Sequence, residues 1–78
     1  MKVIFKRDVL AEHILRRNLS TNSFARKADL TGGHLSQLLA GKRQPAANTR
    51  EKLLKATETE RSSGLEFDDL FEIVTDKS

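Results

Sequence analysis

The stretch TNSFARKADLTGGHLSQLLAGKRQP, residues 21–45, has the pattern of two short helices joined by a tight turn. Ser20 and Thr21 offer side-chain oxygens that can cap the start of a helix. Small and aromatic side chains then recur at helical spacing on one face: Phe24, Ala25 and Ala28. The pattern therefore predicts a first helix of about two turns.

Asp29 follows this helix, and aspartate is one of the few residues that tolerate a left-handed backbone, so a turn of about three to four residues is expected. Thr31 can cap a second helix that ends at Ala40 and Gly41, before Pro45 forbids continuation. Its buried face consists of leucines spaced three and four apart: Leu35, Leu38 and Leu39. Its exposed face consists of the remaining positions: Gly32, Gly33, His34, Ser36 and Gln37.

The run resembles the helix-turn-helix of the lambda-repressor and Cro-like family of phage and bacterial regulators, over roughly residues 9–57. The matching positions, all in family register, are Leu19-Ser20, Phe24-Ala25, Leu30-Thr31, Leu35, Leu38, Gly41-Lys42-Arg43 and Pro45. Two departures stand out. Asp29 occupies the turn position where the family usually has glycine, and Gly32 and Gly33 occupy positions where relatives present side chains to base edges.

The resemblance implies a small all-α domain of five helices with its helix-turn-helix at residues 21–39. The β-branched and aromatic residues at the start of the sequence suggest in addition a short extended N-terminal arm at residues 1–7. The resemblance also implies a DNA-binding transcriptional regulator of phage or mobile-element type that binds double-stranded DNA. Relatives of this size usually bind as homodimers to half-sites about one helical turn apart, roughly 34 Å. The helix at Gly32–Leu39 would then enter the major groove.

Phosphate contacts require cations, hydroxyls, amides or helix N-termini. Residues of these types gather at three places, the first helix start, the chain after the second helix and the next helix start: Thr21, Asn22, Lys42, Arg43, Asn48, Thr49 and Arg50. The resemblance favours Thr21, Lys42 and Arg43 among them. The alternative for Lys42 and Arg43 is an ordinary role as cations at the C-terminal end of a helix.

Base edges in the major groove are read by directional donors and acceptors, which here are His34, Ser36 and Gln37. Gly32 and Gly33 would bring the backbone close to the duplex but read nothing with side chains, so sequence preference should be thin. The same bare surface suggests a second hypothesis. An antirepressor could use this face to grip a partner repressor and block the DNA binding of that protein.

Composition excludes several other classes of protein. The chain has 78 residues and no cysteine, so disulfides and thiolate metal sites are absent, and two histidines alone do not suggest a metal site. No signal peptide or apolar run of about 20 residues is evident, which predicts a cytoplasmic protein without membrane contact. The spacing of serines, histidines and carboxylates gives no case for catalysis, a cofactor or a small-molecule substrate.

Charge is divided unevenly along the chain. Residues 1–55 carry twelve Lys/Arg and four Asp/Glu, a net charge of +8, whereas residues 56–78 carry two and seven, a net charge of −5. A basic body suits phosphate, and an acidic tail either faces away from DNA or serves another partner.

The remaining segments complete a single domain of residues 1–78. The arm, with KVIFK at residues 2–6, is either a flap over the core or a strand that pairs in a dimer. Asp8 is the expected N-cap of a helix that runs to about Arg17, with Asn18 closing it. Asn48 and Glu51 resemble a capping box for a helix that reaches about Thr57.

Residues 58–64, ETERSSG, are polar and predict a loop. The acidic C-terminal segment, residues 65–78, is dense in apolar side chains, and a fifth helix is expected from about Asp68 to Val74. Its apolar residues either close the small core or form a surface for a dimer or another partner.

Overall fold

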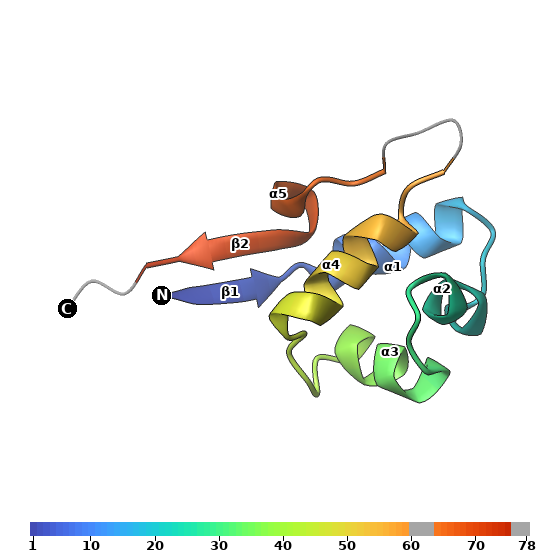
Figure 1. Ribbon diagram of the computed structural model, residues 1–78, viewed down its shortest axis with the longest axis horizontal. Helices are drawn as coiled ribbons and strands as arrows, with labels where there is room; N and C mark the ends of the chain where they lie inside the picture. The colour runs from blue at the N-terminus through green and yellow to red at the C-terminus, as the bar shows by residue number, and fades with distance from the viewer. Residues whose placement is uncertain (60–63, 76–78) are drawn as a thin grey trace.

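The computed structural model describes residues 1–59 and 64–75. The elements follow in the order β1 (Lys2–Phe5), α1 (Arg7–Arg16), α2 (Thr21–Lys27), α3 (Gly32–Leu39), α4 (Ala47–Ala56), α5 (Phe67–Leu70) and β2 (Phe71–Val74). Within the described ranges the protein is thus mostly helical, with five helices, but the two strands pair into a small antiparallel sheet (Figure 1). The prediction of an all-α fold is therefore wrong in this respect.

The fifth helix ends earlier than the sequence suggested, because α5 stops at Leu70 and the chain continues as β2. Asp68 and Asp69 do lie in the first turn of α5, as expected, and Glu66 caps it. From Phe71 onward, however, the aromatic and β-branched residues adopt strand geometry because a partner strand is present. That partner comes from the other end of the chain, which a local pattern does not reveal.

The N-terminal arm is β1, and it pairs with β2 of the same chain in the register Lys2 with Val74 through Phe5 with Phe71. It is therefore a strand, and its pairing is intramolecular. Phe5 is buried and its ring lies 5.5 Å from that of Phe71, centroid to centroid. The arm thus contributes to the core through Phe5.

Two predicted N-caps are wrong, because α1 begins at Arg7 and α4 begins at Ala47. Lys6, not Asp8, precedes α1, and its N–H donates to the Leu70 carbonyl oxygen, so the pairing of the strands fixes where α1 begins. Ala46 precedes α4 without a side-chain cap, and the predicted capping box at Asn48 lies inside that helix.

The core is one cluster to which every element contributes. Its buried residues are Phe5, Leu10, Ile14, Phe24, Ala25, Ala28, Leu35, Leu38, Leu53, Ala56, Leu70 and Phe71. Packing of this kind is what holds short helices in place, because isolated helices of seven to ten residues are unstable in water.

The predicted loop at residues 58–64 lies partly outside the described residues, but its two ends are tied together. The Thr57 hydroxyl is fully buried; it donates to the Leu54 carbonyl oxygen at 2.6 Å and accepts from the Leu65 N–H at 2.8 Å. Because both hydrogen-bonding roles are filled, this buried threonine stabilises the path from α4 to the C-terminal segment.

Candidate nucleic-acid interface

The helix α3 is held at its start by a side-chain cap. Thr31 accepts a hydrogen bond from the His34 N–H at 3.1 Å, which satisfies one of the amide groups that the first turn leaves without a helical partner. Leu35 and Leu38 are fully buried beneath the helix. The predicted bounds and cap of this helix are confirmed.

The preceding helix α2 is built by the same devices. Ser20 accepts from the Ser23 N–H at 3.1 Å, and the turn that follows passes through Asp29 with a φ of 57°. This left-handed conformation is the one predicted from the residue type. Ala25 is 1% exposed where α2 packs on α3, so its small side chain is consistent with a close approach of the two helices.

The exposed face of α3 is polar and carries mostly small side chains. Ser36 and Gln37 are exposed, whereas His34 is half-buried. At Gly33 a methyl group would meet nothing within 4 Å, so this position is open surface. At Gly32, which is half-buried, a methyl group would collide with the side-chain oxygen of Asn22 on α2. A side chain at Gly32 would therefore require Asn22 to move, whereas Gly33 has open space around it.

The basic pair after α3 lies on the connection to α4, at the same edge of the molecule as α3 (Figure 1). Gly41, with a φ of +78°, turns the chain after α3. Lys42 and Arg43 are exposed, and neither makes a side-chain hydrogen bond or ion pair to any residue that the structure describes. Their charges are free to meet an external anion.

The other predicted phosphate contacts differ in how accessible they are. Asn22 and Asn48 are exposed and Thr21 is half-buried. Thr49 is 7% exposed, which leaves its hydroxyl little surface to offer. Arg50 is half-buried and donates to the Pro45 carbonyl oxygen at 3.1 Å, so part of its hydrogen-bonding capacity is used within the protein.

Arg7 also belongs to this region, although sequence reasoning did not select it. Its Nη1 donates to the Leu39 carbonyl oxygen at 3.4 Å, and its guanidinium lies against Gly41, where any side chain would collide with it. A cation at the C-terminal end of a helix is favoured by the helix dipole. Arg7 lies 32 residues before Leu39, so the contact leaves no local signal in the sequence.

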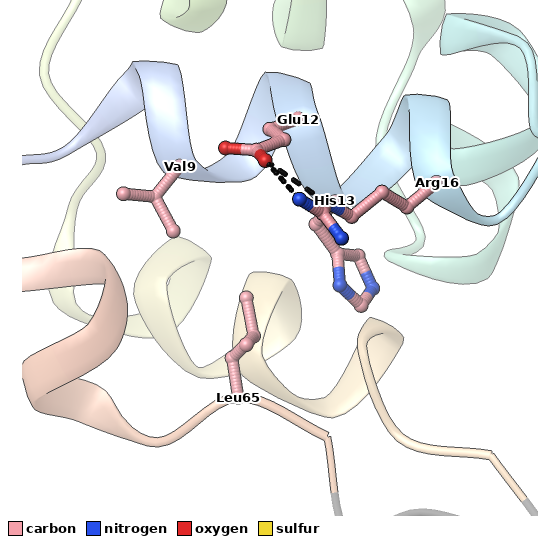
Figure 2. A pocket seen from close by; sticks show the side chains of 5 residues that line it. All are labelled: Val9, Glu12, His13, Arg16 and Leu65. Atoms are coloured by element: carbon pink, nitrogen blue, oxygen red, sulfur yellow. Dashed lines mark hydrogen bonds and ion pairs between the residues drawn. The ribbon is translucent and has the colours of Figure 1, made fainter.

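A second feature lies on another surface, at α1. A hollow of about 220 Å³ is lined by Val9, Glu12, His13, Arg16 and Leu65 (Figure 2). Glu12 and Arg16, one turn apart on α1, form an ion pair at 2.7 Å along one side of it. The His13 ring packs edge-on against Phe24 at 6.2 Å. Burial lowers the pKa of His13 below its usual value of 6.5, and the charges of Arg17 and Lys27 lower it further.

This hollow does not have the composition of a metal or catalytic site. Its carboxylate is already paired with Arg16. Among residues 1–59 and 64–75 there is no cluster of three or more His, Cys, Asp or Glu side chains that could hold a metal ion. Around α3, by contrast, exposed polar side chains lie next to Lys42 and Arg43, whose charges have no partner among the described residues.

Comparisons of the chain with protein-family models, with curated proteins and with solved structures find no match. Within the described ranges, none of the helices has the length and apolar character needed to cross a bilayer.

Proposed function

We propose that the protein is a DNA-binding transcriptional regulator of the phage or mobile-element type, and that α3 enters the major groove. The observation that carries the proposal is the exposed polar face of α3 with two free cations, Lys42 and Arg43, directly after it. This helix is capped at Thr31 and seated on the core through Leu35 and Leu38. The helix is therefore held rigidly, and its polar face is accessible to a DNA duplex.

The charge distribution supports the same conclusion. The net charge of +8 over residues 1–55 provides long-range attraction for a polyanion, and this term dominates affinity while carrying no sequence information. Lys42 and Arg43 are our principal phosphate contacts, with Asn22 and Asn48 as further donors. The accessible surface gives no reason to include the Thr49 hydroxyl.

Sequence preference would rest on few side chains. Gln37 can donate to and accept from an adenine edge, and Ser36 can contact several bases. His34 is half-buried and Gly33 carries no side chain, so the first turn of α3 offers few side chains that could contact base edges. We therefore expect affinity that depends strongly on salt and discriminates modestly between sequences.

The test is a fluorescence titration of labelled duplex DNA from the protein's own locus at two salt concentrations. Replacing both Lys42 and Arg43 by alanine should weaken binding to every sequence and reduce the slope of log affinity against log salt by about 1 per lost contact. Arg17→Ala with Lys55→Ala is the matched control: it removes the same charge from the exposed C-terminal ends of α1 and α4. Equal losses in both variants would reduce the interaction to non-specific attraction and overturn the assignment of α3.

The open surface at Gly33 favours a second candidate, an antirepressor that uses the same face to hold a partner repressor. Gly33→Arg separates the two functions because a side chain fits there without disturbing the fold. If α3 meets DNA, the added cation should strengthen binding or change base preference. If α3 meets a protein, the same side chain should block the partner. If the wild-type protein does not bind DNA but dissociates the complex between DNA and a repressor encoded at the same locus, the antirepressor function is established.

A further inference from the structure

The hollow beside α1 plays no part in the proposed function. It lies between α1 and the chain at Leu65, and Figure 2 shows the Leu65 side chain pointing toward α1 between Val9 and His13. Glu12 and Arg16 form its rim, where their side chains are 61% and 77% exposed. We call this site, lined by these five residues, the α1 hollow.

The α1 hollow and the proposed DNA surface lie on different sides of α1. Ala11, Ile14 and Leu15 face a separate hollow, which is bordered by the start of α2 and the end of α3. Val9 and Arg16, two turns apart, lie on another side of the helix from these three residues. A molecule in the α1 hollow would therefore leave α2 and α3 free to contact DNA.

The size of the α1 hollow suits a single small molecule. Its volume is about 220 Å³, whereas an engineered cavity of about 150 Å³ in another protein binds benzene. Interfaces between proteins, in contrast, involve roughly 20–30 residues on each side, and five described residues line this hollow. The hollow thus has room for one ring with a polar substituent.

The lining favours an aromatic ring over an aliphatic one. Val9 and Leu65 supply apolar contacts. The Arg16 guanidinium at the rim donates two hydrogen bonds to one oxygen of Glu12, at 2.7 and 2.9 Å, and these bonds fix its position. A guanidinium is attracted to the face of an aromatic ring, which is a contact that an aliphatic ring cannot make.

The polar group of the occupant is determined by His13. Its ring lies edge-on to the buried Phe24, with centroids 6.2 Å apart, and neither ring nitrogen is hydrogen-bonded to a described residue. Burial, together with the charges of Arg17 and Lys27, lowers the pKa of His13 below its usual value of 6.5. The ring is therefore predominantly neutral at pH 7, and one of its nitrogens can accept a hydrogen bond. A hydroxyl or N–H group on the occupant would satisfy that nitrogen.

The charges around the α1 hollow disfavour an ionic occupant. Arg17 and Lys27, which disfavour the protonated form of His13, would also repel an ammonium group. A carboxylate would be repelled by Glu12, which already supplies the anion that pairs with Arg16. A neutral occupant avoids both repulsions.

We propose that the α1 hollow binds a small neutral aromatic molecule with one hydrogen-bond donor, of the phenol or indole class. The ring lies between Val9 and Leu65 and against the Arg16 guanidinium, and its donor is directed at the accepting nitrogen of His13. Because the hollow is open to solvent, affinity is modest, with a dissociation constant for phenol on the order of 1 mM. This binding site does not depend on the proposed function.

An NMR titration of the full-length, isotopically labelled protein with phenol tests the proposal. Phenol should shift the amide signals of residues 9–16 and of Leu65, and the shifts should saturate. Anisole, which has the ring but no donor, should bind about 2- to 10-fold more weakly. Cyclohexanol, which has the donor but no aromatic face, should bind about 2- to 5-fold more weakly. Phenol shifts that do not saturate, or that saturate around α3 instead, would overturn the proposal.

Two variants test the assigned contacts. His13→Leu keeps a side chain that can pack on Phe24 but removes the acceptor, so phenol should lose its advantage over anisole. Arg16→Gln, at an exposed position, should weaken the binding of phenol and leave that of cyclohexanol unchanged. If the relative affinities of the three ligands were the same in both variants as in wild type, the proposed mode of binding would be refuted.

A pair of variants on α1 tests the location of the site. Val9→Trp places a larger side chain in the hollow and should abolish saturable phenol binding. Leu15→Trp is the matched control, because Leu15 is 73% exposed and lies on the other hollow of this helix. The same spectra show whether each variant is folded, and Arg16→Gln keeps the test available should Val9→Trp not fold. Phenol binding that persists in folded Val9→Trp, or that is lost in Leu15→Trp alone, would contradict the assigned location.

Discussion

The α2–α3 unit and the β1–β2 sheet lie toward opposite ends of a molecule 43 Å long, and they are built in different ways (Figure 1). The first spans Thr21 to Leu39 as one continuous segment, with its caps and turn supplied by neighbouring residues. The second joins Lys2 to Val74, residues from the two ends of the described chain. Local chemistry determines the first region, while the second exists only once the chain has folded. The two regions should therefore respond differently to mutation.

The largest effect is expected at the sheet end, from Phe71→Ala. Phe71 is 1% exposed, with ring centroids 5.5 Å from Phe5 and 5.1 Å from Phe67. Loss of a buried phenyl ring typically costs about 3–5 kcal/mol, a large part of the free energy of unfolding of a small domain. Urea unfolding followed by helical circular dichroism measures it, with Ile4→Ala on the outer face as the mild control. If the helices kept their stability, the sheet would be an appendage that contributes little to the stability of the core.

A smaller effect is expected in the α2–α3 unit from Thr31→Ala. The mutation removes the hydrogen bond to the His34 N–H, and loss of such a cap typically costs about 1 kcal/mol. Thermal unfolding should show the decrease, whereas Ser36→Ala, at an exposed position without a side-chain hydrogen bond to any described residue, should show almost none. Equal values for the two variants would mean that tertiary packing, rather than the cap, sets the start of α3.

At the turn between α2 and α3, Asp29→Ala should lower the free energy of unfolding by about 0.5–1 kcal/mol, because alanine is less tolerant of a φ of 57°. Asp29→Gly should be close to neutral, since glycine adopts this conformation freely. Both variants lose the ion pair with Lys52 at 3.6 Å, and Lys52→Gln measures that pair alone. If Asp29→Gly and Asp29→Ala were equally destabilising, the effect would come from the lost ion pair with Lys52 and not from the left-handed backbone conformation.

The smallest effect concerns pH and the contact between α1 and α2. The pKa of His13 is lowered by burial and by Arg17 and Lys27, so the unfolded chain binds its proton more readily than the folded one. The stability that depends on neutral His13 is present above the ordinary pKa of 6.5 and declines as pH falls through 6.5 toward the lowered value. Midpoints of thermal unfolding between pH 5 and 8, in wild type and His13→Gln, should converge as pH falls. A difference that is independent of pH would contradict the titration of His13.

Much of the α2–α3 unit could be predicted from the sequence because its determinants are local. Ser20, Thr31 and Asp29 act on residues within three or four positions, and Gly41 ends α3 where expected. The predicted bounds of α3 and the burial of Leu35 and Leu38 follow from the same short-range periodicity. How closely Gly32 approaches Asn22, in contrast, depends on how α2 crosses α3.

The errors fall where a distant partner decides the local structure. The residues after Leu70 are as compatible with a helix as with a strand, and pairing with β1 selects the strand. That pairing also sets the start of α1, through the bond from Lys6 to Leu70, and so displaces the expected cap at Asp8. The contact of Arg7 with Gly41 could not be predicted for a similar reason, because the two residues are far apart in the sequence and meet only in the folded protein.

The sequence by itself determined where α2 and α3 begin and end, that α3 buries Leu35 and Leu38, and that residues 1–55 are basic. Only the tertiary structure decided that both ends of the described chain meet as a sheet, and that Ile73 on this sheet is exposed. Caps, turns and helical periodicity act between neighbours along the chain, so they can be identified one segment at a time. Strand pairing is a contact between segments, and its register is fixed by the burial of Phe5 and Phe71 on one face.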